Sequence, residues 1–574
     1  MEKMKNINPG FQNPGRFYLC VVKMKDRRKR SVLSWSAYLF WCTLFFIFFS
    51  VFTFSTFRFL LEGGFHPRLV SRGNIPAVEV ISDEISASPV ISIRETVIFP
   101  NQALVFLKYP RSTALFTKYT IKCIYVRPNS SQPQLELSPE SIDDEYENQQ
   151  IVRCPLPPRG SIVSVAVNNG NLTPGPTHRW DSLAYDAIVD RDNSTIVFVK
   201  GLNLRSGRVA DSSKFKCLYG WDLSNPKFVL WADVVSVAQE IVRCKTPLSI
   251  LKTSRFDDSI RVSVRLTGRR TIDSIARVKN SQNQNQLSPN FKPISDDYKQ
   301  HEICVCTMLR NQAKFLREWV MYHGKIGVER WFIYDNNSVD DIQNVVTSLV
   351  SSNYNVTKHI WPWIKTQEAG FAHCAVRARD SCKWVGFIDV DEFFHVPYDS
   401  SLIDIVKNQT RSNEVGELRV PCHSFGPSGL KQTPTKGVMA GYTCRLAVPE
   451  RHKSIVKPEA LNSSLINVVH HFHLKSGFRH VNMNRSSMVI NHYKYQVWDV
   501  FKEKFQRRVA TYVSDWQQER NVGSKDRAPG LGTKAVEPVD WSTRFCEVRD
   551  TGLRDWVFET FMDPKTGMLP WEEK

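Results

Sequence analysis

The first long feature of the chain is an uncharged, apolar stretch near its N-terminus. Residues 31–57 contain no Asp, Glu, Lys or Arg and are rich in Phe, Leu, Val and Trp. As a helix this stretch would extend about 40 Å, which exceeds the roughly 30 Å hydrocarbon core of a bilayer. The apolar region of a cleaved signal peptide is shorter, about 7–15 residues, and ends at small residues. The pattern therefore predicts a single transmembrane helix.

Charge around this stretch predicts how it is oriented. Residues 1–30 form a basic tail with nine Lys or Arg against two acids. Basic flanks remain in the cytosol, so residues from about 58 onward are expected in the lumen. Eight N-x-[ST] sequons and 11 of the 13 cysteines lie beyond the stretch, in what would be an oxidising compartment. A chain with net charge +19 could bind nucleic acid, but seven of those charges belong to the tail, which removes nucleic acid as an expected partner.

The region after the predicted anchor is rich in β patterns. Residues 58–90 have little periodicity and are predicted to form a stem, whereas residues 91–270 alternate short β-rich runs with turn signals. This pattern is typical of an all-β, sandwich-like module. Within it, Lys-Cys-x-Tyr followed by Ile-Val-Arg-Cys occurs twice. The repeat predicts two equivalent disulfides, Cys123–Cys154 and Cys217–Cys244.

The β-rich region also carries large aromatic side chains, which have two open interpretations. They are either flat platforms that bind carbohydrate or part of the apolar core. The residues concerned are Trp180, Tyr185, Trp221 and Trp231. Residues 271–297 then become polar and are predicted to be a linker.

Residues 298–574 have a different periodicity, because strand-like runs alternate with amphipathic helices. This alternation predicts a parallel, doubly wound α/β sheet whose ligand site lies at the carboxyl ends of the strands. The predicted strands are 303–309, 331–334, 356–361 and 384–388, and the predicted helices are 313–325, 342–350 and 366–382.

A D-x-D element follows the last of these strands. Asp389 and Asp391 come directly after an apolar run. Carboxylates in apolar surroundings are costly unless they bind a cation, and oxygen ligands suit Mn²⁺ or Mg²⁺, which would hold a diphosphate. A solvated loop that caps the next helix is the alternative. A second copy, Asp190-Arg191-Asp192, lies between two β runs and is interpreted as a hairpin turn.

The order of motifs in this region resembles glycosyltransferase family 92, and the whole chain resembles the plant galactan β-1,4-galactosyltransferases of that family. The motifs concerned lie at 314–319, 335–338, 361–362, 373–374, 387–393, 425–429, 455–458 and 492–493. The resemblance implies a GT-A (Rossmann-like) fold, UDP-galactose as donor, Mn²⁺ as cofactor with Mg²⁺ as an alternative, and inversion at the anomeric carbon. It further implies a β-1,4-galactan acceptor on the rhamnogalacturonan I side chains of pectin, a type II Golgi membrane protein, and compatibility with a homodimer.

The resemblance also carries roles onto individual residues. Asp391 is expected to be a direct metal ligand, with Asp389 near both the metal and the ribose, and His492 is the candidate third ligand, with His470, His471 and His473 behind it. The nucleotide-sugar contacts are expected from Thr307, Arg310, Asn311, Asp335 and Asn337.

Inversion requires a general base beside the acceptor hydroxyl. The loop 425–429 has no acid, so Glu450 is the candidate and Glu417 the alternative. Six basic residues of the C-terminal half are best placed to meet a diphosphate or an acidic polymer: Lys453, Lys457, Lys502, Lys504, Arg507 and Arg508. The last four lie on a predicted amphipathic helix, and a merely solvated basic face is the alternative. Two other functions remain open, a non-catalytic carbohydrate-binding protein and a metal-dependent glycan hydrolase.

Overall fold

The computed structural model describes residues 91–572, apart from 109–114, 129–132, 147–148, 168–169, 206, 253–259, 279–298, 398–399 and 513–536. All described residues belong to one compact unit, Leu69–Lys574. The predicted tail, anchor and stem (1–90) lie outside the described residues. Within the described ranges, no helix is long and apolar enough to cross a membrane.

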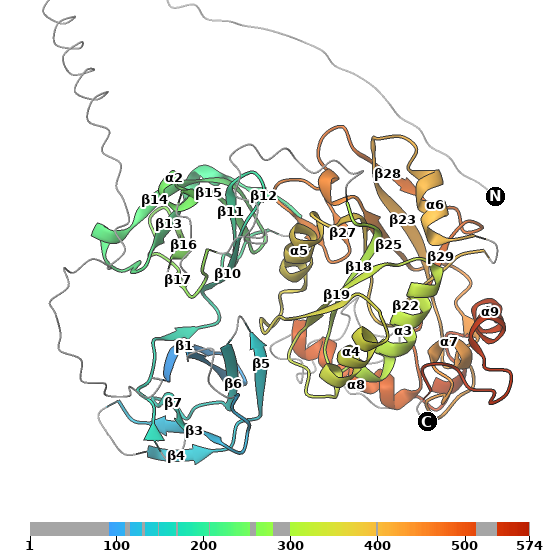
Figure 1. Cartoon of the computed structure of the whole chain (residues 1–574), viewed down its shortest axis with the longest axis horizontal. Helices are drawn as coiled ribbons and strands as arrows, with labels where there is room; N and C mark the ends of the chain where they lie inside the picture. Colours follow the sequence, from blue (N-terminus) through green and yellow to red (C-terminus); the bar gives the residue numbers. More distant parts are fainter. Residues whose placement is uncertain are drawn as a thin grey trace, which may run out of the picture. The chain divides into compact units, whose positions relative to one another are not determined.

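The β-rich region forms two modules rather than the single sandwich that we predicted (Figure 1). The first has a five-stranded sheet, in the order β5–β6–β2–β1–β9, and a four-stranded sheet, in the order β4–β3–β7–β8. Its strands are β1 (Ser92–Ile98), β2 (Gln102–Lys108), β3 (Ile121–Val126), β4 (Pro133–Leu137), β5 (Ser141–Tyr146), β6 (Gln149–Pro155), β7 (Ile162–Val167), β8 (Gly170–Asn171) and β9 (Thr177–Arg179).

The second module has the strand order β16–β13–β14–β15–β11–β10–β17, with β12 paired to β14. Strand β17 lies within residues 271–297, which we predicted to be a linker. Its pairing with β10 makes this part of the predicted linker a strand of the second module. The strands are β10 (Leu183–Val189), β11 (Ser194–Lys200), β12 (Val209–Ala210), β13 (Phe215–Gly220), β14 (Leu230–Ala238), β15 (Ile241–Lys245), β16 (Arg261–Leu266) and β17 (Asp273–Ser274). The short helix α2 (Leu248–Leu251) lies between β15 and β16 in the chain.

One disulfide lies in the core of each module. Cys123 is bonded to Cys154, and Cys217 to Cys244, so both predicted pairings are confirmed. All four cysteines are fully buried within their modules' separate apolar cores. The repeated sequence thus marks two copies of a similar unit.

The described residues from 299 onward form an α/β region with a mixed sheet. Its first four strands, in the order β20–β19–β18–β21, are parallel, as we expected. Strands β25–β23–β29–β22 extend the sheet beyond β21, and β28 pairs with β23. The strands are β18 (His301–Leu309), β19 (Arg330–Asp335), β20 (Val356–Ile360), β21 (Cys382–Phe387), β22 (Glu392–His395), β23 (Val415–Ser424), β25 (Arg451–Val456), β28 (Arg479–Asn482) and β29 (Val489–His492).

Helices cover both faces of this sheet (Figure 1). Val305 and Ile333 share one core with helices α3 and α4, whereas Cys306 and Phe332 face α5 on the other side. The helices are α3 (Ala313–Ile326), α4 (Ile342–Ser351), α5 (Gln367–Ala378), α6 (Leu402–Gln409), α7 (Val438–Gly441), α8 (Trp498–Tyr512) and α9 (Gly552–Phe561). Short pairs are formed by β24 (Cys444–Arg445) with β30 (Val548–Arg549) and by β26 (Asn467–Val468) with β27 (His471–Phe472).

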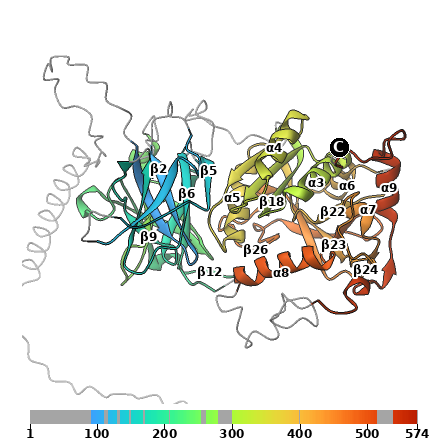
Figure 2. The ribbon, with the colours of Figure 1, turned by 90° about the horizontal axis from the view of Figure 1, so that it is seen from below.

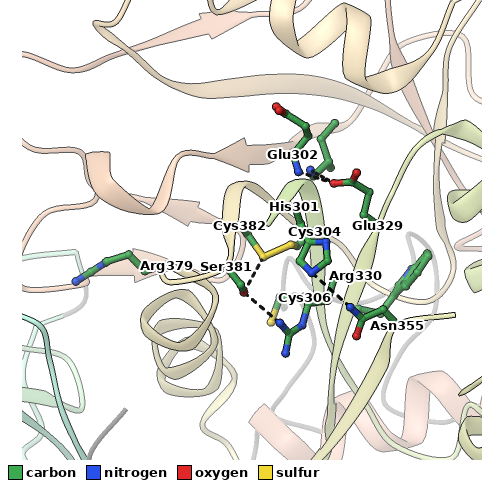
Figure 3. Close-up of a disulfide and its surroundings, with 12 residues drawn as sticks. His301, Glu302, Cys304, Cys306, Glu329, Arg330, Asn355, Arg379, Ser381 and Cys382 are labelled. Atoms are coloured by element: carbon green, nitrogen blue, oxygen red, sulfur yellow. Dashed lines mark hydrogen bonds between the residues drawn. A yellow bond between two sulfur atoms is a disulfide. The ribbon is translucent and has the colours of Figure 1, made fainter. Parts of the chain in front are cut away.

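Helix α5 ends earlier than the sequence predicted. We expected a helix to Cys382, but Cys382 begins β21, where it pairs with His301 of β18 and forms a disulfide with Cys304 (Figure 3). Tertiary pairing therefore overrides the helical pattern at this point. The described cysteines also form the disulfides Cys306–Cys374 and Cys444–Cys546 and leave Cys422 as a buried free thiol.

Both β modules share an aromatic contact with the α/β region. Trp180, which follows β9 and donates its backbone N–H to the Ile98 carbonyl of β1, stacks on Trp363 with ring centroids 5.6 Å apart, and Tyr185 of β10 packs against the same indole. Both β-module residues are buried and belong to this core, whereas Trp221 and Trp231 remain 36% and 50% exposed. Of the four aromatic residues, only these last two keep the geometry of an exposed platform.

The second D-x-D copy forms the turn that we predicted, and its charges join the second β module to the α/β region. Asp190 lies between β10 and β11 and accepts hydrogen bonds from Arg243 and Arg379, at 2.8 and 2.7 Å. Arg191 pairs with Asp380 and Glu459 of the α/β region. This acidic pair is thus engaged in ion pairs that hold the β module to α5.

A buried carboxyl makes the stability of the α/β region depend on pH. Glu318 of α3 accepts hydrogen bonds from the backbone N–H groups of Val438 and Met439, at 2.8 and 2.9 Å. Gly437, with a φ of 94°, precedes them, and a Cβ there would lie 2.6 Å from the carboxyl. Burial raises the pKa of Glu318 from 4.5 to about 7.

Replacement of Glu318 by Gln should flatten the pH dependence of stability. Because the pKa of Glu318 is raised in the folded state, its contribution to the free energy of unfolding is fully present below pH 4.5, the unfolded pKa. This contribution is lost as pH rises through about 7. Tm measured between about pH 5 and pH 8 should therefore fall more in the wild type than in Glu318→Gln. The exposed Glu559→Gln is the matched control, and parallel wild-type and Glu318→Gln curves would refute the assignment.

Candidate functional site

The D-x-D element forms a tight turn between β21 and β22. The backbone N–H of Asp389 donates to Glu392 Oε2 at 2.9 Å, and the N–H of Glu392 donates to the Asp389 carbonyl at 3.0 Å. Glu392 is fully buried and Asp391 is 8% exposed. These bonds fix where the two aspartate side chains leave the strand end.

His492 is brought to this turn by sheet pairing. Strand β29 runs antiparallel to β22 and places His492 directly opposite Glu392. The N–H of Tyr493 donates to the Asp391 carbonyl at 2.9 Å. As a result, His492 Nε2 lies 3.4 Å from Asp391 Oδ2. The predicted Asp391 and His492 therefore lie together.

A lysine from α8 reaches the same carboxylate. Helix α8 is labelled in Figure 2. Lys504 Nζ contacts Asp391 Oδ2, so this oxygen faces both the ammonium of Lys504 and the imidazole of His492. Burial alone would raise the pKa of Asp391, but Lys504 and His492 outweigh it and hold the pKa far below its usual value. Burial lowers the pKa of His492 and keeps its ring neutral, which is the form that ligates metals.

Asp389 has a separate set of partners. Its Oδ2 lies 3.6 Å from His470 Nε2 and 3.8 Å from Lys453 Nζ. The Nδ1 atom of His470 is 2.8 Å from the Phe387 carbonyl, which orients the ring, and Lys453 also pairs with Glu392 at 2.6 Å. Although burial opposes ionisation, His470 and Lys453 hold the pKa of Asp389 well below its usual value.

These donors fit a divalent cation. Two neighbouring ligands of an octahedral ion, each about 2.1 Å away from it, are about 3 Å apart. Asp391 Oδ2 and His492 Nε2 are close to that spacing, and His492 Nε2 is buried with no hydrogen-bond partner among the described residues. Asp389, Glu392 and His470 form a neighbouring group of ligand-type atoms within 4.8 Å of one another. Oxygen and imidazole donors of this kind suit Mn²⁺ or Mg²⁺.

The five candidate nucleotide-sugar residues lie along two adjacent strands. Thr307 is buried within β18, and Arg310 is exposed just past its end. Asp335 ends β19 and accepts from the Ser338 N–H at 3.0 Å. Asn311 accepts from the Val339 N–H at 2.8 Å and thereby joins the two strand ends.

Asn337 completes this group. Its Nδ2 donates to the Pro362 carbonyl at 3.1 Å, while Oδ1 is buried with no hydrogen-bond partner among the described residues. Its φ is 66°, a left-handed conformation that asparagine tolerates. The amide side chains of Asn311 and Asn337 therefore bind the backbone of this loop region. The ligand contacts expected of the five residues stay predictions.

The two candidate bases have different surroundings. Glu450 is about one-third exposed, its Oε2 accepts from Lys494 at 2.9 Å, and it also accepts from Ser424, the residue paired with His492 in the sheet. Although burial alone would raise its pKa, Ser424 and Lys494 lower it. Glu417, the alternative, is fully buried and is held by Ser454 at 2.5 Å and Arg419 at 3.1 Å, so it does not face an acceptor in solvent.

Three members of the site were only secondary candidates from the sequence. His470 was ranked behind His492, and Lys453 and Lys504 were two of six basic residues considered for a diphosphate or an acidic polymer. A helical wheel offered one signal: Lys504 lies beside Phe501 and Phe505, which are buried on the inner face of α8, whereas Lys502 is exposed. No local pattern singles out His470 or Lys453, because their positions depend on long-range pairing.

Comparison with known proteins identifies the class. The model of glycosyltransferase family 92 matches residues 299–522, a range that includes the four parallel strands and the D-x-D turn. A glycosyltransferase family 92 protein of Ricinus communis is 60% identical over 561 residues, covering 96% of this chain and 100% of that protein. The chain belongs to glycosyltransferase family 92.

More distant similarities cover less of the chain. A beta-1,4-galactosyltransferase of Caenorhabditis elegans is 25% identical over 275 residues, 44% of this chain and 60% of that protein. Among solved structures, a mannosyltransferase from Pyrobaculum calidifontis in complex with GDP-Man and Mn²⁺ is similar, with a TM-score of 0.25 and 12% identity, over 39% of this chain and 64% of that chain.

Proposed function

We propose that this chain transfers galactose from UDP-galactose, with inversion, onto β-1,4-galactan chains of pectin. The observation that carries a metal-assisted transfer is the convergence of Asp391 and His492 at a buried strand end. The related nematode protein, a beta-1,4-galactosyltransferase, supports the sugar and the linkage. The galactan acceptor rests on the resemblance of the motifs.

Asp391 and His492 would hold a divalent cation, with Asp389 beside it. When bound, such a cation neutralises the diphosphate of the donor and so improves it as a leaving group. His470 and Lys453 keep Asp389 ionised. Asp335, Asn337, Thr307, Arg310 and Asn311 would bind the nucleoside part of the donor at the neighbouring strand ends.

Glu450 is the proposed general base. It would take the proton of the acceptor hydroxyl as that oxygen forms a bond to the anomeric carbon. The bond from this carbon to the diphosphate oxygen breaks on the opposite face, and UDP leaves with the electron pair. Because its pKa is lowered, the Glu450 carboxyl is ionised and ready to accept at neutral pH.

The luminal part incubated with UDP-galactose, Mn²⁺ and a short β-1,4-galactan primer tests this proposal. Primer extension, lost with EDTA and restored by Mn²⁺, is the expected result. Binding without turnover would favour a carbohydrate-binding protein, and primer shortening would favour a hydrolase. Transfer from another UDP-sugar only, with no product from UDP-galactose, would refute the donor assignment but not the family.

We also propose a type II location in the Golgi membrane, with residues from about 58 onward in the lumen. Five disulfides in the described residues support an oxidising compartment. Protease treatment of intact Golgi vesicles should leave the α/β region protected, and digestion of this region without detergent would contradict the topology.

A further inference from the structure

Lys504 is the one described cation on α8 that contacts the D-x-D element. Its Nζ meets Asp391 Oδ2, the oxygen that also lies 3.4 Å from His492. Helix α8 is held there by an aromatic cluster of its own: Trp498 and Phe501 pack against the buried Trp541, and Phe505 packs against Phe501. The lysine therefore projects from an anchored helix, not from a free surface.

We infer that Lys504 is a donor-positioning residue, which binds the diphosphate of the nucleotide sugar and balances the charge of Asp391. This inference rests on the proposed function. A divalent cation at Asp391 and His492 would need the oxygen that Lys504 contacts. The ammonium and such a cation therefore compete for one carboxylate, and phosphate oxygens brought to the cation come within reach of Nζ. Ammonium groups bind phosphate as compact point charges.

This role makes opposite predictions for metal and nucleotide. In Lys504→Met, removal of a competing positive charge should strengthen Mn²⁺ binding in the absence of nucleotide by several-fold, roughly. Loss of a charge-assisted contact should weaken UDP binding at saturating Mn²⁺ by about 10- to 100-fold. Binding of uridine, which has no phosphate, should stay unchanged. A merely structural lysine would move all three in the same direction.

The matched control is Lys502→Met, which removes an exposed lysine from the same helix and should behave as the wild type. Lys504→Arg keeps the charge and should recover most of the UDP affinity, which guards against a simple loss of folding. Mn²⁺ binding can be followed by the EPR signal of the free ion, and UDP and uridine binding by calorimetry.

Unchanged UDP affinity in Lys504→Met would overturn the inference, as would equal losses of UDP and uridine binding. The proposed function fails separately: a wild type that binds neither Mn²⁺ nor UDP would overturn both. A different outcome would refute only the role of Lys504. In that outcome the wild type binds both Mn²⁺ and UDP, Asp391→Asn no longer binds Mn²⁺, and Lys504→Met keeps full UDP affinity.

Discussion

Replacement of Asp391 by Asn should lower glycosyl transfer by at least about 10³-fold, because a metal ligand contributes several kcal/mol of transition-state stabilisation. The substitution keeps the size of the side chain but removes the charge that Lys504 and His492 face. The rate of UDP release in the presence of acceptor, measured at saturating donor, checks the loss. Mn²⁺ affinity should fall with it.

The chain contains its own control for this experiment. Asp192 occupies the second position of the other D-x-D, is 58% exposed, and pairs with Arg243 at 3.2 Å in a β turn. Asp192→Asn should therefore retain transfer. An Asp391→Asn enzyme with near-normal turnover, or an equal loss in Asp192→Asn, would contradict the assignment of the site to residues 389–391.

Replacement of Glu450 by Gln should reduce kcat by about 10²- to 10⁴-fold, the usual contribution of a general base. UDP affinity should hold, because the carboxyl contacts Lys494 and Ser424 and no group assigned to the donor. Initial rates at varied acceptor and donor, combined with calorimetry of UDP binding, separate these two effects.

Glu547→Gln is the comparison for Glu450. Glu547 is exposed and accepts a hydrogen bond from the N–H of Ala447 at 2.9 Å. Ala447 lies three residues before Glu450 in the same loop. Glu547→Gln should leave turnover unchanged. A Glu450→Gln enzyme with wild-type kcat would remove Glu450 as the base, and a matched fall in UDP affinity would point to a structural role.

Much of the fold follows from local patterns. The alternating periods placed β18, α3, β19, α4 and β20 to within two residues, because amphipathic helices and buried strands differ in their spacing. The repeated Lys-Cys-x-Tyr and Ile-Val-Arg-Cys segments predicted two disulfides, and both form. The sequence did not separate the two β modules, because β9 rejoins the first sheet only through a parallel pairing with β1.

The site was predictable only in part. Asp389 and Asp391 follow an apolar strand, which is a local signal, and His492 closes another such run. Their neighbours come from far along the chain: Lys453 through the antiparallel pairing of β25 with β21, and Lys504 through the packing of α8. Such contacts depend on sheet order and helix docking, which no window of sequence contains.

Asp391 and His492 are proposed to hold the divalent cation that binds the donor diphosphate. An anomalous difference map at the manganese edge, from crystals of residues 58–574 soaked with MnCl₂ and UDP, tests this directly. We expect a peak bound by Asp391 and His492, with diphosphate density beside it. A peak confined to the separate group of Glu417, His452 and His471, or diphosphate bound away from Asp391, would contradict it.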